Sequence, residues 1–227
     1  MAVLPDEALL AQRHLHPRIR VGGGGGTLSS SYHDHGARDR PEVALTFDDG
    51  PGRLTARVLD VLAAAGARAT FNVLGERVQE RGALLRRVLD EGHEIGNHAY
   101  RHERLEGRPL EAYRQVRRTN GALAATTGAT PRVFRAPYGS VSPGVVRAAR
   151  LAGLVTVGWD VDPRDYEEPP AATILERVVQ ATRPGSIVLL HDDRRALEAT
   201  AVALEGILGA LGARGLRFVT VSELLAR

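Results

Sequence analysis

Two acidic residues stand side by side in the segment TFDDGP, directly after a run of apolar residues. The carboxylates of Asp48 and Asp49 repel each other, and both cannot be buried at a strand end without a partner for the charge. The segment NHAYRH places His98 and His102 four residues apart, which predicts two imidazoles on one face of a helical turn. Two histidines and one carboxylate form a ligand set for a divalent metal ion that keeps positions open for water and substrate. We therefore predict a metal ion that neutralises one of the two acids.

The second acid and a further histidine predict acid–base chemistry beside that metal. One acid can bind the metal while the other acts as general base on an attacking water. A purely structural role, in which Asp48 opens the turn ahead of Gly50 and Pro51, accounts for only one of the two acids. His191 ends the apolar run IVLLH, where a histidine is often a satisfied structural group. Its expected position opposite the metal segment favours a general acid instead.

Apolar runs suited to strands alternate with segments of helical periodicity along the chain. Short strands rich in Val, Ile and Leu, separated by amphipathic helices, predict an α/β fold with a parallel sheet covered by helices. Seven such units favour a closed or nearly closed (β/α) barrel over an open sheet. The expected strands are 43–47, 68–74, 93–98, 132–135, 154–159, 186–191 and 216–221, and the expected helices are 55–67, 83–92, 109–128, 142–153, 170–185 and 196–215.

A single domain is expected over residues 42–227. Residues 1–41 precede it, and their glycine- and serine-rich part predicts a flexible lead-in. In a parallel barrel the carboxyl ends of all strands open on one face, where catalytic residues collect. We therefore expect one mouth to gather the polar and aromatic residues that follow the strands, namely Asp48, Asp49, His98, His102, Arg135, Trp159, Asp165 and His191.

The composition argues against several other kinds of protein. The net charge is only +3, the arginines are scattered and aromatic residues make up 4%, so we expect no nucleic-acid partner. The chain lacks a run of about 18 apolar residues, so no membrane span is expected. Its start lacks the basic and apolar regions of a signal peptide, which leaves the localisation undecided. There are no cysteines, so disulfides and thiolate metal sites are excluded. For the oligomeric state, a monomer is the default expectation.

Five segments of the chain resemble, in order and spacing, the five motifs of the polysaccharide deacetylases, also called the NodB-homology group or carbohydrate esterase family four. They are TFDDGP, NHAYRH, RAPYG, WDVDPRDY and IVLLHD, and the resemblance extends over residues 42–225. It implies a distorted (β/α) barrel and the removal of acetyl groups from N-acetylglucosamine polymers such as chitin or peptidoglycan, or from acetylated xylan. It also implies one divalent metal ion, for which zinc is expected and cobalt or nickel would suit the same ligands.

The resemblance assigns roles to individual residues. Asp48 is expected to be the catalytic base, with Asp49, His98 and His102 as the metal ligands. His191 is the expected acid, and Asp165 is expected to tune it. The remaining expected site residues are Arg135 in the groove, Tyr138 with a backbone N–H for the oxyanion, Leu189 against the acetyl methyl group, and Trp159 at the substrate.

Some positions depart from the family pattern without removing a charged catalytic group, so we expect an active enzyme. Ala99 and Glu103 replace a hydroxyl residue and a proline in the second motif, Tyr166 stands in place of tryptophan, and Asn72 replaces an aromatic residue. Three alternatives stay open. The scaffold could act on O-acetyl esters of xylan or on a small amide, or it could be an inactive carbohydrate-binding module. Phosphoryl transfer on magnesium is disfavoured, because the chain lacks a glycine-rich loop followed by lysine.

Overall fold

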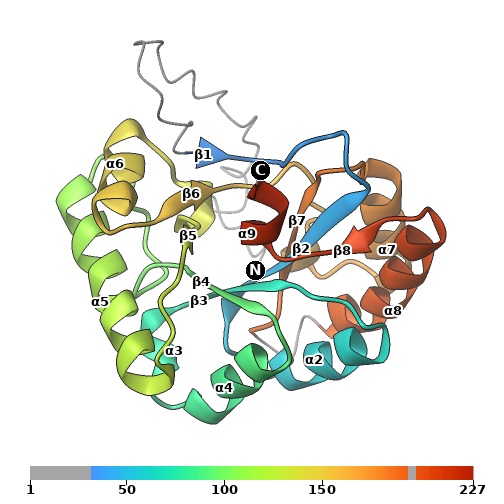
Figure 1. Cartoon of the computed structure of the whole chain (residues 1–227), viewed down its shortest axis with the longest axis horizontal. Helices are drawn as coiled ribbons and strands as arrows, with labels where there is room; N and C mark the ends of the chain where they lie inside the picture. The colour runs from blue at the N-terminus through green and yellow to red at the C-terminus, as the bar shows by residue number, and fades with distance from the viewer. Residues whose placement is uncertain (1–31, 194–197, 227) are drawn as a thin grey trace, which may run out of the picture.

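The computed structural model describes residues 32–193 and 198–226, with strands at its centre and helices around them (Figure 1). The strands are β1 (Tyr32–His33), β2 (Glu42–Gly50), β3 (Thr70–Val73), β4 (Glu94–Asn97), β5 (Val133–Phe134), β6 (Val155–Val157), β7 (Ile187–His191) and β8 (Arg217–Phe218). They follow the path β1-β6-β5-β4-β3-β2-β7, and β8 pairs with β2 off this path. Every ladder between these strands is parallel.

Helices follow most strands and cover the outside of the sheet (Figure 1). They are α2 (Thr55–Ala64), α3 (Gly75–Val78), α4 (Gly82–Asp90), α5 (Pro109–Thr127), α6 (Pro143–Leu151), α7 (Ala171–Ala181), α8 (Glu198–Ala213) and α9 (Val221–Leu225). Short 3-10 turns occur at Pro137–Gly139 and Asp165–Glu167. Within the described ranges, no helix combines the length and the apolar character needed to cross a bilayer.

The predicted α/β fold with parallel strands is confirmed. Each of the seven expected strands corresponds to one of the strands from β2 to β8. The ring is not closed by a continuous ladder, because β7 meets the β6 side through an isolated bridge between Val161 and Val188. This arrangement is the distorted barrel that the resemblance implies.

The segment before Glu42 contributes a strand that the sequence did not predict. Tyr32 and His33 pair with β6, and the N–H of Gly36 donates to the carbonyl of Gly185 at 2.7 Å. Arg38 donates to Asp160 at 2.7 Å. The expectation of a flexible lead-in is therefore wrong for residues 32–41, while residues 1–31 lie outside the described part of the chain. A two-residue strand without an apolar run gives no periodic signal in the sequence.

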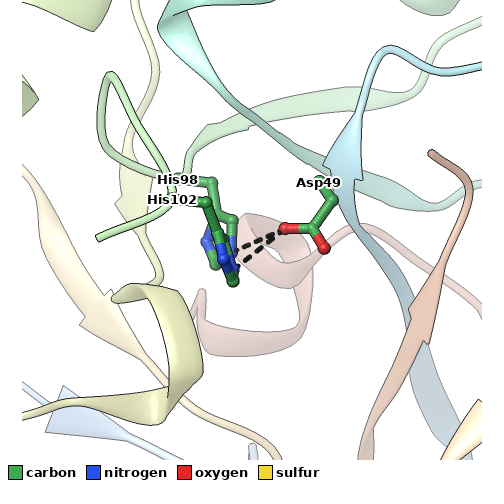
Figure 2. Close-up of side chains that lie close together, drawn as sticks. All are labelled: Asp49, His98 and His102. Atoms are coloured by element: carbon green, nitrogen blue, oxygen red, sulfur yellow. Dashed lines mark ion pairs between the residues drawn. The ribbon is translucent and has the colours of Figure 1, made fainter. Parts of the chain in front are cut away.

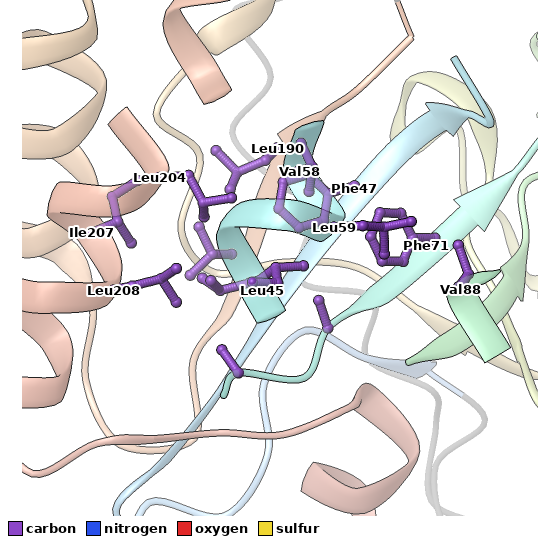
Figure 3. Packing of buried hydrophobic residues seen from close by; sticks show 14 of the residues in the cluster. Leu45, Phe47, Val58, Leu59, Phe71, Val88, Leu190, Leu204, Ile207 and Leu208 are labelled. Carbon is purple, nitrogen blue, oxygen red and sulfur yellow. The ribbon is translucent and has the colours of Figure 1, made fainter. Parts of the chain in front are cut away.

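Alternation along β2 separates the two sides of the sheet. Val43, Leu45 and Phe47 point outward into the main hydrophobic cluster. In Figure 3, Phe47 and Leu45 lie near Val58 and Leu59 of α2 and Leu204 of α8, and all are part of this cluster. Because adjacent side chains of a strand face opposite sides, Thr46 and Asp48 point into the barrel.

The interior of the barrel is apolar at the amino ends of the strands and polar nearer their carboxyl ends. At the amino ends of the strands, α9 seals the barrel with Val221 and Leu224, which pack against Ala44 and Ile187. Figure 1 shows α9 across the middle of the ring of strands. Thr220 begins this helix with a capping box, in which its side chain accepts from the N–H of Glu223. The amino end of the barrel is therefore filled with apolar side chains.

Candidate metal centre and active site

Three side chains converge where β2 and β4 end. Nε2 of His98 lies 3.3 Å from Oδ1 of Asp49, and Nε2 of His102 lies 3.2 Å from the same oxygen. Figure 2 shows both imidazoles facing the carboxylate of Asp49. One ligand atom from each of the three residues lies within 4.8 Å of the others. The convergence predicted from the two motifs is therefore present.

A bulge in β2 explains how two adjacent acids reach the same mouth. Neighbouring residues of a regular strand point to opposite faces. The pairing of β2 with β3 shifts between Asp48 and Gly50, and Asp49 adopts a φ of 71°. Such a bulge redirects a side chain, and the left-handed conformation is one that aspartate tolerates better than most residues. The bulge therefore turns Asp49 toward the histidines while Asp48 remains on the interior face.

The predicted helical turn between the two histidines is wrong. His98 directly follows β4, and the chain from there to His102 makes bends without helix. Ala99 has a φ of 65°, and its N–H donates to the side-chain oxygen of Asn97 at 2.8 Å. This local hydrogen bond offers the backbone an alternative to helix. The loop brings the histidines together by a different route from the one that their spacing suggested.

The protonation of these groups suits a cation. Nδ1 of His98 lies 2.8 Å from the carbonyl oxygen of Arg135, which accepts but cannot donate, so Nδ1 carries a proton and Nε2 is the nitrogen that faces Asp49. Burial lowers the pKa of His102 to about 4, against the opposing charge of Asp49. Burial raises the pKa of Asp49, but contact with His98 and the charges of His191 and His102 outweigh it and hold the pKa well below its usual range. Among the described residues, no well-aligned hydrogen bond reaches the buried Oδ1 of Asp49. Two imidazole nitrogens that face one carboxylate oxygen fit a divalent metal.

Asp48 has a different partner for its charge, the guanidinium of Arg135. The Arg135 side chain is fully buried, and one of its nitrogens donates to Oδ1 of Asp48 at 2.9 Å and to Thr46 at 2.6 Å. Its other terminal nitrogen donates to the carbonyl of Gly158 at 2.7 Å. Asn72 donates to the same Oδ1 of Asp48 at 2.7 Å. Arg135 thus lies buried in the barrel, in direct contact with Asp48.

His191 pairs with Asp48 across the β2–β7 ladder and is fixed by Asp165. Nδ1 of His191 donates to Oδ1 of Asp165 at 2.8 Å, and the N–H of His191 donates to Oδ2 at 2.9 Å. Thr200 of α8 donates to that Oδ2 at 2.9 Å. Burial lowers the pKa of His191, but the charge and hydrogen bond of Asp165, with smaller contributions from Asp49 and Asp48, raise the pKa to about 10. His191 is therefore protonated at neutral pH.

Aromatic side chains border the same mouth. Tyr138 lies in the 3-10 turn with a φ of 58°, and its ring centroid is 4.2 Å from that of His102. Trp159 packs against this turn at Gly139, where an added Cβ would lie 2.9 Å from the indole ring. Leu189 lies two residues before His191 on β7, so both face the interior. The structure thus places Tyr138 beside His102, and Leu189 on the same face of β7 as His191.

The hydrogen bonds that hold the acids in place were not predicted. Asn72 appeared in the sequence as a departure from an aromatic position, and Thr46 and Thr200 carried no signal of their own. The available signal was the phase of the strands, because Thr70 and Asn72 alternate with the outward-facing Phe71 and Val73. Polar residues at alternate positions of a strand in a parallel barrel indicate a polar interior.

The fold and the site together define an enzyme of the α/β-barrel class, with a candidate metal centre and an acid–base pair at the carboxyl ends of its strands. A model of the polysaccharide deacetylase family matches residues 35–157. The chain belongs to this polysaccharide deacetylase family.

Similar proteins share most of the chain. A chitooligosaccharide deacetylase from Sinorhizobium fredii is 42% identical over 77% of this chain and 87% of its own length. A peptidoglycan-N-acetylglucosamine deacetylase from Bacillus cereus is 41% identical over 81% of this chain and 87% of its own length. The solved structure of a family 4 acetyl xylan esterase from Clostridium thermocellum, in complex with a cobalt ion, is 38% identical, with a TM-score of 0.76 over 80% of this chain and 89% of that one.

Proposed function

We propose that this protein hydrolyses the acetamide group of N-acetylglucosamine residues in peptidoglycan or a chitin-like polymer and releases acetate. The observation that carries the proposal is the convergence of Asp49, His98 and His102 beside Asp48, whose register partner on β7 is His191. The two similar deacetylases, which are named for N-acetylglucosamine and chitooligosaccharide substrates, support this substrate class. Because these polymers lie outside the cytoplasm, we propose that the protein acts there. We propose a monomer as its oligomeric state.

Asp49, His98 and His102 would hold a divalent ion, for which zinc is the proposed identity. The ion supplies polarisation of the acetyl carbonyl and a lower pKa for the attacking water. Cobalt or nickel would suit the same donor atoms, and the similar esterase contains cobalt. Both histidines offer nitrogen and Asp49 offers one buried oxygen, which leaves open positions for water and substrate.

The flanking residues would move the protons. Asp48 takes the proton of the water that attacks the acetyl carbon, through Oδ2, because Oδ1 already accepts from Arg135 and Asn72. As the C–N bond breaks, the protonated His191 donates its Nε2 proton to the leaving amine. The backbone N–H of Tyr138 would stabilise the oxyanion. Leu189 would contact the acetyl methyl group, and Trp159 would border the sugar.

Hydrolysis of O-acetyl groups is the second candidate, because an acetyl xylan esterase shares this fold. An ester needs less help with protonation of its leaving group than an amide does. The pairing of His191 with Asp165, which keeps the imidazole protonated, therefore favours the amide. An inactive carbohydrate-binding module would have no use for this acid.

Metal removal tests the proposal directly. Chelation should lower acetate release by at least about 100-fold, because the lost polarisation is worth several kcal/mol, and added zinc should restore it. Release is measured from N-acetylglucosamine oligomers, peptidoglycan and acetylated xylan. Restored activity on xylan alone would establish the esterase. Absence of acetate from every glycan, with glycan still bound, would establish the binding module.

Replacing Asp165 with asparagine should move the alkaline limb of the kcat–pH profile to lower pH. A general acid works only while protonated, so the rate falls as the pH passes its pKa. In the wild type, the charge of Asp165 opposes the effect of burial on His191. Without that charge, burial should lower the pKa of His191, and the alkaline limb should move down by about 1–3 pH units. The profile is measured on an amide substrate between about pH 6 and 10.

Glu167→Gln is the matched control for this profile, because Glu167 lies in the same 3-10 turn and pairs with Arg164 at the surface. The control should keep the wild-type profile. An alkaline limb that does not move in Asp165→Asn would refute the role of His191 as the acid.

A further inference from the structure

Asn72 makes a direct contact with the proposed base from inside the barrel. It lies on β3, has no exposed surface, and donates through Nδ2 to Oδ1 of Asp48 at 2.7 Å. Its neighbours Phe71 and Val73 point outward into the hydrophobic cluster. An amide therefore occupies an interior position where a β-branched apolar residue would suit the strand better.

The amide of Asn72 is costly for folding. Within the described part of the chain, the buried Oδ1 of Asn72 has no hydrogen-bond partner, and an unsatisfied buried acceptor destabilises the folded state. The amide also limits which residue can stand at position 96 of β4, because Gly96 lies opposite Asn72 in the β3–β4 register. A Cβ at Gly96 would lie 2.1 Å from that same oxygen. The side chain is thus a poor choice for stability, and the hydrogen bond that it donates goes to Asp48.

We propose that Asn72 is a positioning residue for the base. Together with Arg135 it supplies two donors to Oδ1 of Asp48, which fixes the rotation of the carboxylate. The other oxygen, Oδ2, then faces Nε2 of His98 at 3.9 Å and is the one directed at the metal centre. This inference rests on the proposed function, because it assigns the proton transfer to Oδ2 of Asp48.

Asn72→Val separates positioning from stability. Valine is shorter than asparagine, so it removes the donor without pressing on Asp48. We expect kcat for acetate release to fall about ten-fold, which is part of the effect of a general base. KM and the zinc bound per chain should not change. The Tm should change little, because removal of the unsatisfied oxygen offsets loss of the hydrogen bond to Asp48.

Thr156→Val is the matched control. The Oγ1 of Thr156 on β6 is also buried, and no hydrogen-bond partner for it occurs in the described ranges. The control should leave kcat unchanged and should not lower the Tm. If Asn72→Val does not fold, Asn72→Ala removes the same donor and carries the same expectation for kcat.

The outcomes distinguish this inference from the function on which it rests. A wild-type protein that releases no acetate rejects the proposed function. An active wild type with unchanged kcat in Asn72→Val and Asn72→Ala rejects only the positioning role. A joint loss of Tm and bound zinc in both variants would also overturn it, because Asn72 would then be structural.

Discussion

Replacing Asp48 with asparagine should reduce kcat by about 1,000-fold, within the range of 10²–10⁴ that a general base contributes. Asparagine keeps an oxygen that can accept from Arg135 and Asn72, so the barrel should still fold, with a lower Tm because the buried Arg135 loses its counter-charge. The metal ligands are untouched, so zinc should bind at one ion per chain. The measurements are acetate release under saturating substrate and metal content after dialysis.

Asp60→Asn provides the matched control for Asp48→Asn. Asp60 is exposed on α2 and pairs with Arg87 at 2.6 Å, and such surface pairs contribute little to stability. The control should keep the wild-type kcat. If Asp48→Asn binds zinc and retains full activity, Asp48 is not the base, and another group must accept the proton of the attacking water.

Replacing Arg135 with methionine should produce the largest loss of stability. The change leaves the carboxylate of Asp48 buried without its cationic partner, and breaking a buried ion pair in this way costs about 3–5 kcal/mol. For a chain of this size, the Tm should fall by roughly 10 °C. The Tm is measured by thermal unfolding at neutral pH, where Asp48 in the unfolded chain is ionised.

The double variant Arg135→Met with Asp48→Asn tests the cause of that loss. With no charge left at either position, the combined loss in free energy of unfolding should be smaller than the sum of the single losses by about 1–3 kcal/mol. Strict additivity would contradict a direct charge interaction between the two side chains. The loss from Arg135→Met would then arise from packing alone.

The sequence predicted the order of the elements well because their apolar periodicity is strong. The strands β2 and β7 are the clearest cases, because the segments VALTF and IVLL are buried throughout. β1 was missed, because its pairing with β6 depends on contacts made by Gly36 and Arg38 far along the chain. Such pairings leave no local pattern.

The candidate site was predicted by residue type but not by geometry. The spacing of His98 and His102 suggested a helical turn, whereas Ala99 takes a positive φ and the chain forms a loop. The bulge that redirects Asp49 has no signature apart from the glycine and proline that follow it. The burial of Arg135 under Asp48 also escaped prediction, because strand alternation places a side chain on a face without revealing its depth.

Apolar side chains of α9 fill the barrel at the amino ends of the strands. Leu189, the proposed neighbour of the acetyl methyl group, lies deeper along β7 than His191. On the proposed function, acetate would therefore form on the interior side of the sugar, between the glycan and the end of the barrel that α9 fills.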